Sequence, residues 1–116
     1  MAERPVLGSG TGSFPKEYAR LKQGQGILTV NPHNEYLLLG VQLGALGVLL
    51  FAALLAVQWR LAARVPSELI PIAHGMVLAF ALGSLFNSFL LDFTEGHFYA
   101  YFSAVLYSAL GARHAT

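Results

Sequence analysis

The sequence predicts an all-α, polytopic membrane protein with two to three transmembrane helices. Hydrophobic residues make up 55% of the 116 residues and charged residues only 11%, whereas an ordinary globular domain carries about 25% charged residues. The few charges also leave long gaps, because residues 36–59 and 69–91 are uncharged stretches of 24 and 23 residues. About 20 apolar residues are enough to cross a bilayer as a helix, so each gap predicts a span.

The composition argues against several other classes of protein. A soluble core of this size could not cover two helices that are apolar all round, which makes a pair of buried helices the weaker alternative. The chain has no cysteine, so neither a disulfide framework nor a thiolate metal site is expected. Its net charge of +1 gives no electrostatic basis for binding nucleic acid. The first residues are polar and no apolar stretch follows them, so no signal peptide is expected.

Residues 1–32 are predicted to lie outside the membrane. Their glycine-rich stretch at residues 8–13 predicts a flexible turn; a phosphate cradle is the alternative, although the lysine of a P-loop is missing. Phe14, Tyr18 and Leu21 then follow at positions i, i+4 and i+7. This spacing is typical of a short amphipathic helix on a membrane surface.

Residues 33–112 are predicted to form the membrane domain, with spans at about 35–58, 69–91 and 95–111. For the first span, Asn31 is the predicted helix cap and Pro32 the first helical residue. The third apolar stretch is short, and a re-entrant helix is the alternative there. A helix that begins near Thr94 would reach about 19 residues and would cross.

Small residues recur at helical spacing along the first two predicted spans. Such a face lets another helix approach closely, and glycine weakens a helix that has no packing partner. We therefore expect helix packing at two glycine faces: Gly40, Gly44 and Gly47 on the first span, and Gly75 and Gly83, with Ala79 between them, on the second.

His33 is the strongest candidate for a catalytic residue. It stands at the mouth of the first span, and its predicted place is the first turn of the helix. The start of a helix offers free N–H groups to an anion such as a diphosphate. A neutral histidine beside such a site is what a general base requires in chemistry with a phosphate leaving group. A histidine bonded to its own loop is the structural alternative.

Polar residues at the end of the second span are predicted to lie on the same side of the membrane as His33, because one helical hairpin separates them. They could bind a cation or a polar substrate, and a solvated loop is the alternative. The spacing of the histidines and carboxylates lacks a local metal-binding pattern, so no metal is predicted. The candidate substrate-binding residues are Glu35, Asn87, Asp92 and Glu95.

The segment around His33 resembles a motif of bacterial O-antigen ligases. The motif is a histidine, then Asn, Ser or Gln, then nine residues, then Gly-x-x-Gly. Here His33 and Asn34 are followed by nine residues and then by Gly44-Ala45-Leu46-Gly47. Residues 7–14 upstream and 83–88 downstream, followed by Asp92 and Glu95, are also similar to this family, so the resemblance covers nearly the whole chain.

The resemblance implies a polytopic glycosyltransferase with a GT-C-type fold. Such ligases transfer a glycan from undecaprenyl diphosphate to lipid A–core at the periplasmic face of the bacterial inner membrane, with no cofactor and no obligatory metal. The role of general base would fall on His33, with Asn34 in support. Residues 1–35 and 92–97 would be periplasmic, and Arg60 and Arg64 cytoplasmic.

The length of the chain departs from this family, whose members have many more helices ahead of the motif. We therefore expect a C-terminal fragment that lacks its N-terminal partner helices and is inactive alone. A protein O-oligosaccharyltransferase and an O-antigen polymerase, both of the same superfamily, remain alternatives that differ in acceptor. A small non-catalytic membrane assembly protein is the alternative from another class.

Overall fold

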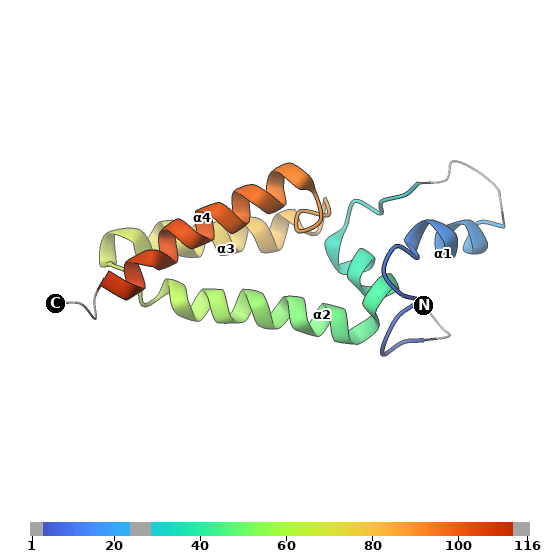
Figure 1. Cartoon of the computed structure of the whole chain (residues 1–116), viewed down its shortest axis with the longest axis horizontal. Helices are drawn as coiled ribbons and strands as arrows, with labels where there is room; N and C mark the ends of the chain where they lie inside the picture. The colour runs from blue at the N-terminus through green and yellow to red at the C-terminus, as the bar shows by residue number, and fades with distance from the viewer. Residues whose placement is uncertain (1–3, 24–28, 113–116) are drawn as a thin grey trace.

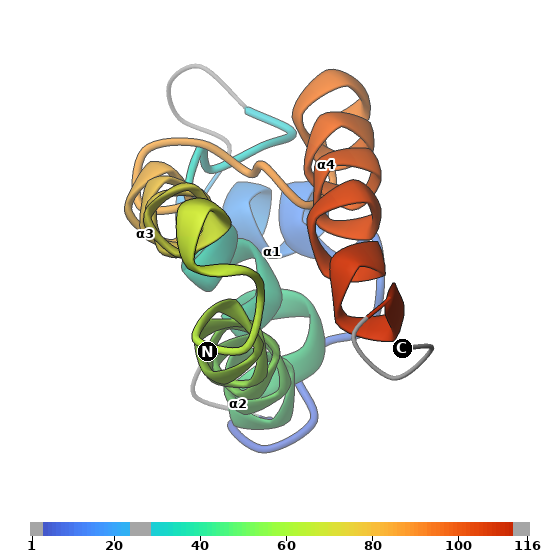
Figure 2. The same ribbon diagram turned by 90° about the vertical axis from the view of Figure 1, so that its left-hand side faces the viewer.

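The computed structural model describes residues 4–23 and 29–112, and in these residues the regular secondary structure is entirely helical. The elements in chain order are α1 (Phe14–Leu21), α2 (Glu35–Ala62), the 3-10 turn η1 (Ser67–Leu69), α3 (Ile70–Gly83) and α4 (Phe93–Ala112). Helices α2, α3 and α4 run along one another, and α1 lies beyond one end of them (Figure 1). Seen end-on, these three helices occupy the corners of a triangle (Figure 2). The all-helical prediction is confirmed for this part of the chain.

Aromatic and aliphatic side chains fill the space between the three helices. Around the middle of the bundle, the Phe80 ring stacks on Tyr99 with 3.6 Å between centroids, and Phe51 of α2 packs against Phe80 at 6.3 Å. Closer to the turn between α2 and α3, a second buried cluster consists of Ala62, Val65, Ala73 and Leu106. Each cluster draws residues from α2, or the turn after it, and from both α3 and α4, so the three helices share one core.

Helix α2 is broken at Gly44, whose φ of 67° and ψ of −158° are far from helical values. Four backbone groups at the break are bonded instead to an N-terminal turn segment, residues 5–10. The carbonyls of Val41 and Gln42 accept from the N–H groups of Ser9 and Gly10, and the N–H groups of Ala45 and Leu46 donate to the carbonyls of Pro5 and Val6. The segment therefore replaces two helical hydrogen bonds with four bonds of its own.

Glycine permits this close approach on both sides. A Cβ atom on Gly44 would lie 2.5 Å from the carbonyl carbon of Val6, and one on Gly8 would lie 2.5 Å from the carbonyl carbon of Gln42. Both glycines also have positive φ values, 67° and 66°, which glycine adopts without strain. The partner that packs here is thus a turn segment of the same chain, and not the helix that the glycine spacing led us to expect.

The other glycines of the predicted faces have different surroundings. At Gly47 an added Cβ would meet Leu43 of the same helix, and at Gly83 it would meet the ring of Phe89. Gly75 has open space, with no atom within 4 Å of an added Cβ. Gly40 is buried and lines a groove beside the helix break.

The predicted helix cap before the first span was wrong by three residues, although α2 begins at Glu35, where the span was predicted to start. Asn34, with an extended backbone, caps α2 by accepting a hydrogen bond from Leu37 N–H, whereas Asn31 and Pro32 belong to the loop before it. His33, between Pro32 and Asn34, has a φ of 49°. This left-handed conformation cannot continue a helix that begins at Pro32. His33 therefore precedes the helix and is not in its first turn.

The apolar stretch at residues 69–91 is not one continuous helix, because α3 ends at Gly83 and turns follow as far as residue 92. The carbonyls of Ser84 and Leu85 accept from Glu35 N–H and the Asn34 side chain at the start of α2, which holds them out of a longer helix. Helix α4 begins at Phe93, close to the predicted Thr94, and α1 covers the predicted amphipathic segment.

Candidate functional site

Three of the predicted site residues, His33, Asn34 and Asn87, lie where two loops come together at one end of the bundle. The loop before α2, residues 29–34, lies beside the turns between α3 and α4, residues 84–92 (Figure 1). Side chains of the first loop bond to the second, and the first residue of α2 bonds to it as well. His33 and the end of the second apolar stretch therefore lie at the same end of the bundle, and their position on one side of a membrane stays a prediction.

His33 is exposed and is held from two sides. Its backbone N–H donates to Oδ1 of Asn31 at 2.9 Å, and its ring Nδ1 lies 3.3 Å from Oδ1 of Asn87. An amide oxygen only accepts hydrogen bonds, so this pair requires the proton to be on Nδ1. The lone pair of Nε2 is then available to accept a proton.

Asn31 holds the loop in the conformation that presents His33. Besides accepting from His33, its Oδ1 accepts from the hydroxyl of Ser88 at 2.7 Å, and Thr29 bonds to its backbone. Ser88 is almost fully buried. Asn31 was predicted to cap the helix instead, and nothing in the sequence predicts the role of Ser88. In the sequence, Asn31 and Ser88 share only one feature, because each is a polar residue near the end of an apolar stretch. This feature is too weak to identify them as a pair.

Asn34 links the start of α2 to the opposite loop. Its Oδ1 caps Leu37 N–H at 2.9 Å, and its Nδ2 donates to the Leu85 carbonyl at 2.8 Å. The N–H of Glu35 donates to the Ser84 carbonyl at 2.8 Å. Two N–H groups at the start of the helix are therefore already bonded within the chain. This corrects the idea that they are free to bind a diphosphate.

Glu35 is buried, with 0% of its surface exposed. Its Oε2 accepts from Leu90 N–H at 2.9 Å, while Oε1 has no hydrogen-bond partner in the described part of the chain. The hydroxyl of Ser84 is buried and without a partner there too. Through the bond to Leu90, Glu35 ties α2 to the turn before α4. Its role in substrate binding stays a prediction.

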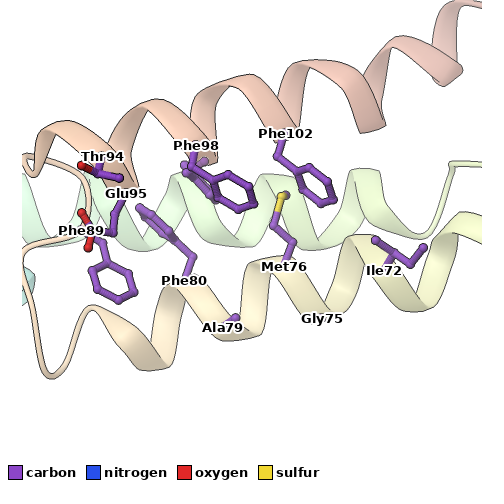
Figure 3. A pocket seen from close by; sticks show the side chains of 11 residues that line it. Ile72, Gly75, Met76, Ala79, Phe80, Phe89, Thr94, Glu95, Phe98 and Phe102 are labelled. Carbon is purple, nitrogen blue, oxygen red and sulfur yellow. The ribbon is translucent and has the colours of Figure 1, made fainter.

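The two remaining predicted residues, Asp92 and Glu95, do not lie against His33 as Asn87 does. Asp92 ends the turns before α4, where its backbone N–H donates to the Ser88 carbonyl. Glu95 lies in the first turn of α4 and lines an apolar groove between α3 and α4 (Figure 3). Within residues 4–23 and 29–112, no hydrogen bond or ion pair joins either carboxylate to His33. Of the predicted substrate-binding residues, only Asn87 is thus brought into contact with it.

The described residues contain no group of three or more histidine and carboxylate side chains placed to hold a metal ion. Comparison of the chain with known protein families, curated proteins and solved structures gave no match.

Proposed function

We propose that this protein is an integral membrane protein. Of the described helices, only α2 is long and apolar enough to cross a bilayer, counted over both parts that flank the break at Gly44. Its large apolar side chains also face outward, for example Leu49 and Leu50, which are 66% and 62% exposed. Helices α3 and α4 expose Leu78, Leu82, Phe98 and Val105 in the same way. Large apolar side chains exposed in this number are unfavourable in water but suit contact with lipid.

We further propose that the His33 site serves glycan transfer from undecaprenyl diphosphate to lipid A–core, as in O-antigen ligases, at the periplasmic face of the bacterial inner membrane. The observation that carries this proposal is the contact between His33 Nδ1 and Asn87 Oδ1. It leaves Nε2 of an exposed histidine as a proton acceptor, and the histidine sits in the motif that resembles the ligase family.

In the proposed reaction, His33 performs one proton transfer. Nε2 takes the proton of the acceptor hydroxyl while that oxygen forms a bond to the anomeric carbon of the glycan. The bond from this carbon to the diphosphate oxygen breaks, and the diphosphate leaves with the electron pair. General-base assistance of this kind contributes about 10²- to 10⁴-fold to a rate.

Asn34 and Asn87 have supporting roles in this proposal. Asn34 fixes the start of α2 and the turn at Leu85, and Asn87 orients the imidazole. No arginine of the chain is assigned to the donor diphosphate, which would be held by further helices.

A non-catalytic role as a membrane assembly partner is the second candidate. One observation favours this role: several groups of the site are already buried or hydrogen-bonded to other parts of the chain. Glu35 is buried, Asn34 bonds on both sides, and N–H groups at the start of α2 have partners. In this case His33 would only stabilise its loop.

Mutation of the His33 codon in the natural host distinguishes glycan transfer from the assembly role. We expect His33→Ala and His33→Gln to lower the attachment of O-antigen to lipopolysaccharide by about 10²-fold or more, as seen on gels. His97→Ala is the matched control, because His97 is an exposed histidine at the same end of the bundle. Normal O-antigen attachment in the His33 variants, together with an intact membrane complex, would favour the assembly role.

A further inference from the structure

We propose that the groove between α3 and α4 binds one acyl chain of a membrane lipid whose headgroup carries an ammonium group, with the ammonium at Glu95. This inference rests on the membrane location proposed above and does not depend on the chemistry at His33. It assigns a ligand to a cavity of about 550 Å³ at the surface of the bundle.

The lining of the groove suits a hydrocarbon chain. Along its length it is bordered by the large apolar side chains Met76, Phe80, Phe98 and Phe102 (Figure 3). Gly75 forms an open part of the lining, since an added Cβ there would meet no atom within 4 Å. From the level of residue 72 to that of residue 80 the groove follows about 12 Å of helix, at roughly 1.5 Å per residue.

The polar end of the groove is acidic. Thr94 and Glu95 lie at the end nearest the loop between α3 and α4, and Figure 3 shows the Glu95 carboxylate next to Phe89. None of the 11 lining residues is lysine, arginine or histidine. A carboxylate at the mouth attracts an ammonium group and repels a headgroup with only negative charge.

The position of the Glu95 carboxylate at one end of the groove favours a lipid as the occupant. The loop end of the groove is the end where α3 and α4 leave the proposed bilayer, so Glu95 would lie at headgroup depth and the phenylalanines at acyl-chain depth. A second copy of the chain or another helix in the groove would cover the carboxylate, and would then need its own cation opposite Glu95.

Photo-crosslinking of the whole chain in lipid vesicles tests this inference. The vesicles are made of phosphatidylglycerol with a trace of a probe that carries a photoactivatable group in one acyl chain. The probe has either a phosphatidylethanolamine or a phosphatidylglycerol headgroup, and mass spectrometry locates the labelled residues. We expect the ethanolamine probe to label residues 98–102 and Met76 about two- to fivefold more than the glycerol probe, which is the range for one exposed ion pair.

Two variants separate the headgroup from the acyl chain. Glu95→Gln should abolish the preference between the probes and leave labelling by both. Gly75→Leu should fill the groove and lower labelling by both probes, without a clash at the backbone. Asp92→Asn is the control, because Asp92 lies near the same loop but does not line the groove; it should retain the preference.

Equal labelling by the two probes in the unaltered chain would overturn the proposal, as would a preference that survives Glu95→Gln. Crosslinks between two copies of the chain through the groove would show that a second copy, and not a lipid, occupies the groove. Failure of the membrane location itself is recognised separately, because the chain would then be released from the vesicles by alkaline carbonate.

Discussion

The Nδ1 nitrogen of His33 lies 3.3 Å from Oδ1 of Asn87, across a sequence separation of 54 residues. The contact joins the loop before α2 to the turns between α3 and α4. It also selects one tautomer of the imidazole, with the proton on Nδ1 and the lone pair on Nε2. The structural role and the proposed catalytic role of His33 thus depend on the same pair.

Replacement of Asn87 tests this pairing. Asn87→Ala removes the acceptor and leaves the ring free to rotate, so we expect O-antigen attachment to fall about tenfold, which corresponds to the loss of one hydrogen bond of about 1.4 kcal/mol. Asn87→Asp retains an acceptor and should lose less. Attachment is measured in the host strain with His33→Ala as the lower limit. Equal activity of Asn87→Ala and the unaltered protein would remove Asn87 from the proposal.

Part of this site could be predicted from the sequence and part could not. His33, Asn34 and Asn87 stand out because they are polar residues at the edges of apolar stretches. The burial of Glu35 is not visible in the sequence, because its partner Leu90 N–H is a backbone group 55 residues away. The role of Asn31 was misassigned for a related reason. Asn31 and Asn34 are both good helix caps, and only the left-handed conformation of His33 decides between them.

Glu35 is expected to matter for stability more than for chemistry. Glu35→Ala would leave Leu90 N–H buried without an acceptor and would open a cavity, so we expect a loss of about 2–4 kcal/mol in the free energy of unfolding. Glu35→Gln keeps an acceptor oxygen for Leu90 and should lose less than half of that. Thermal unfolding in detergent micelles compares the two variants. A Glu35→Ala variant as stable as the unaltered chain would show that the bond to Leu90 contributes nothing.

The broken helix provides a separate test with a matched control. Gly8, Gly10 and Gly44 all have positive φ, but an added Cβ clashes with backbone only at Gly8 and Gly44. We therefore expect Gly8→Ala and Gly44→Ala to displace residues 5–10 from α2 and to speed the hydrogen exchange of Ser9 and Gly10 N–H by about tenfold or more, since both N–H groups lose the carbonyls of Val41 and Gln42 as acceptors. Gly10→Ala carries the strain of positive φ without the clash and should leave this exchange near its normal rate.

The same region shows why the fold was only partly predictable. Hydrophobic periodicity and length give the existence of the helices, because apolar stretches that lack charge favour helix. The break at Gly44 is a tertiary feature, since it requires residues 5–10 to supply four hydrogen bonds from far along the chain. Glycine at helical spacing indicated a close approach, but not that a turn segment of the N-terminal region would make it. The end of α3 at Gly83 is likewise set by bonds from Asn34 and Glu35.

Accessibility of single cysteines tests the proposed membrane location most directly. The chain has no cysteine, so Phe86→Cys, Leu50→Cys and Arg64→Cys would each carry one thiol. Phe86 lies in the loop beside His33 and is 80% exposed, Leu50 lies on the outer face of α2, and Arg64 lies in the turn at the opposite end of the bundle (Figure 1). A membrane-impermeant maleimide is added to spheroplasts before and after lysis.

We expect Phe86→Cys to react before lysis, Arg64→Cys only after lysis, and Leu50→Cys in neither case. This result would place the His33 loop on the periplasmic side and the turn after α2 on the cytoplasmic side. Reaction of Leu50→Cys in intact spheroplasts, or reaction of Phe86→Cys and Arg64→Cys from the same side, would contradict the membrane arrangement on which the proposed glycan transfer depends.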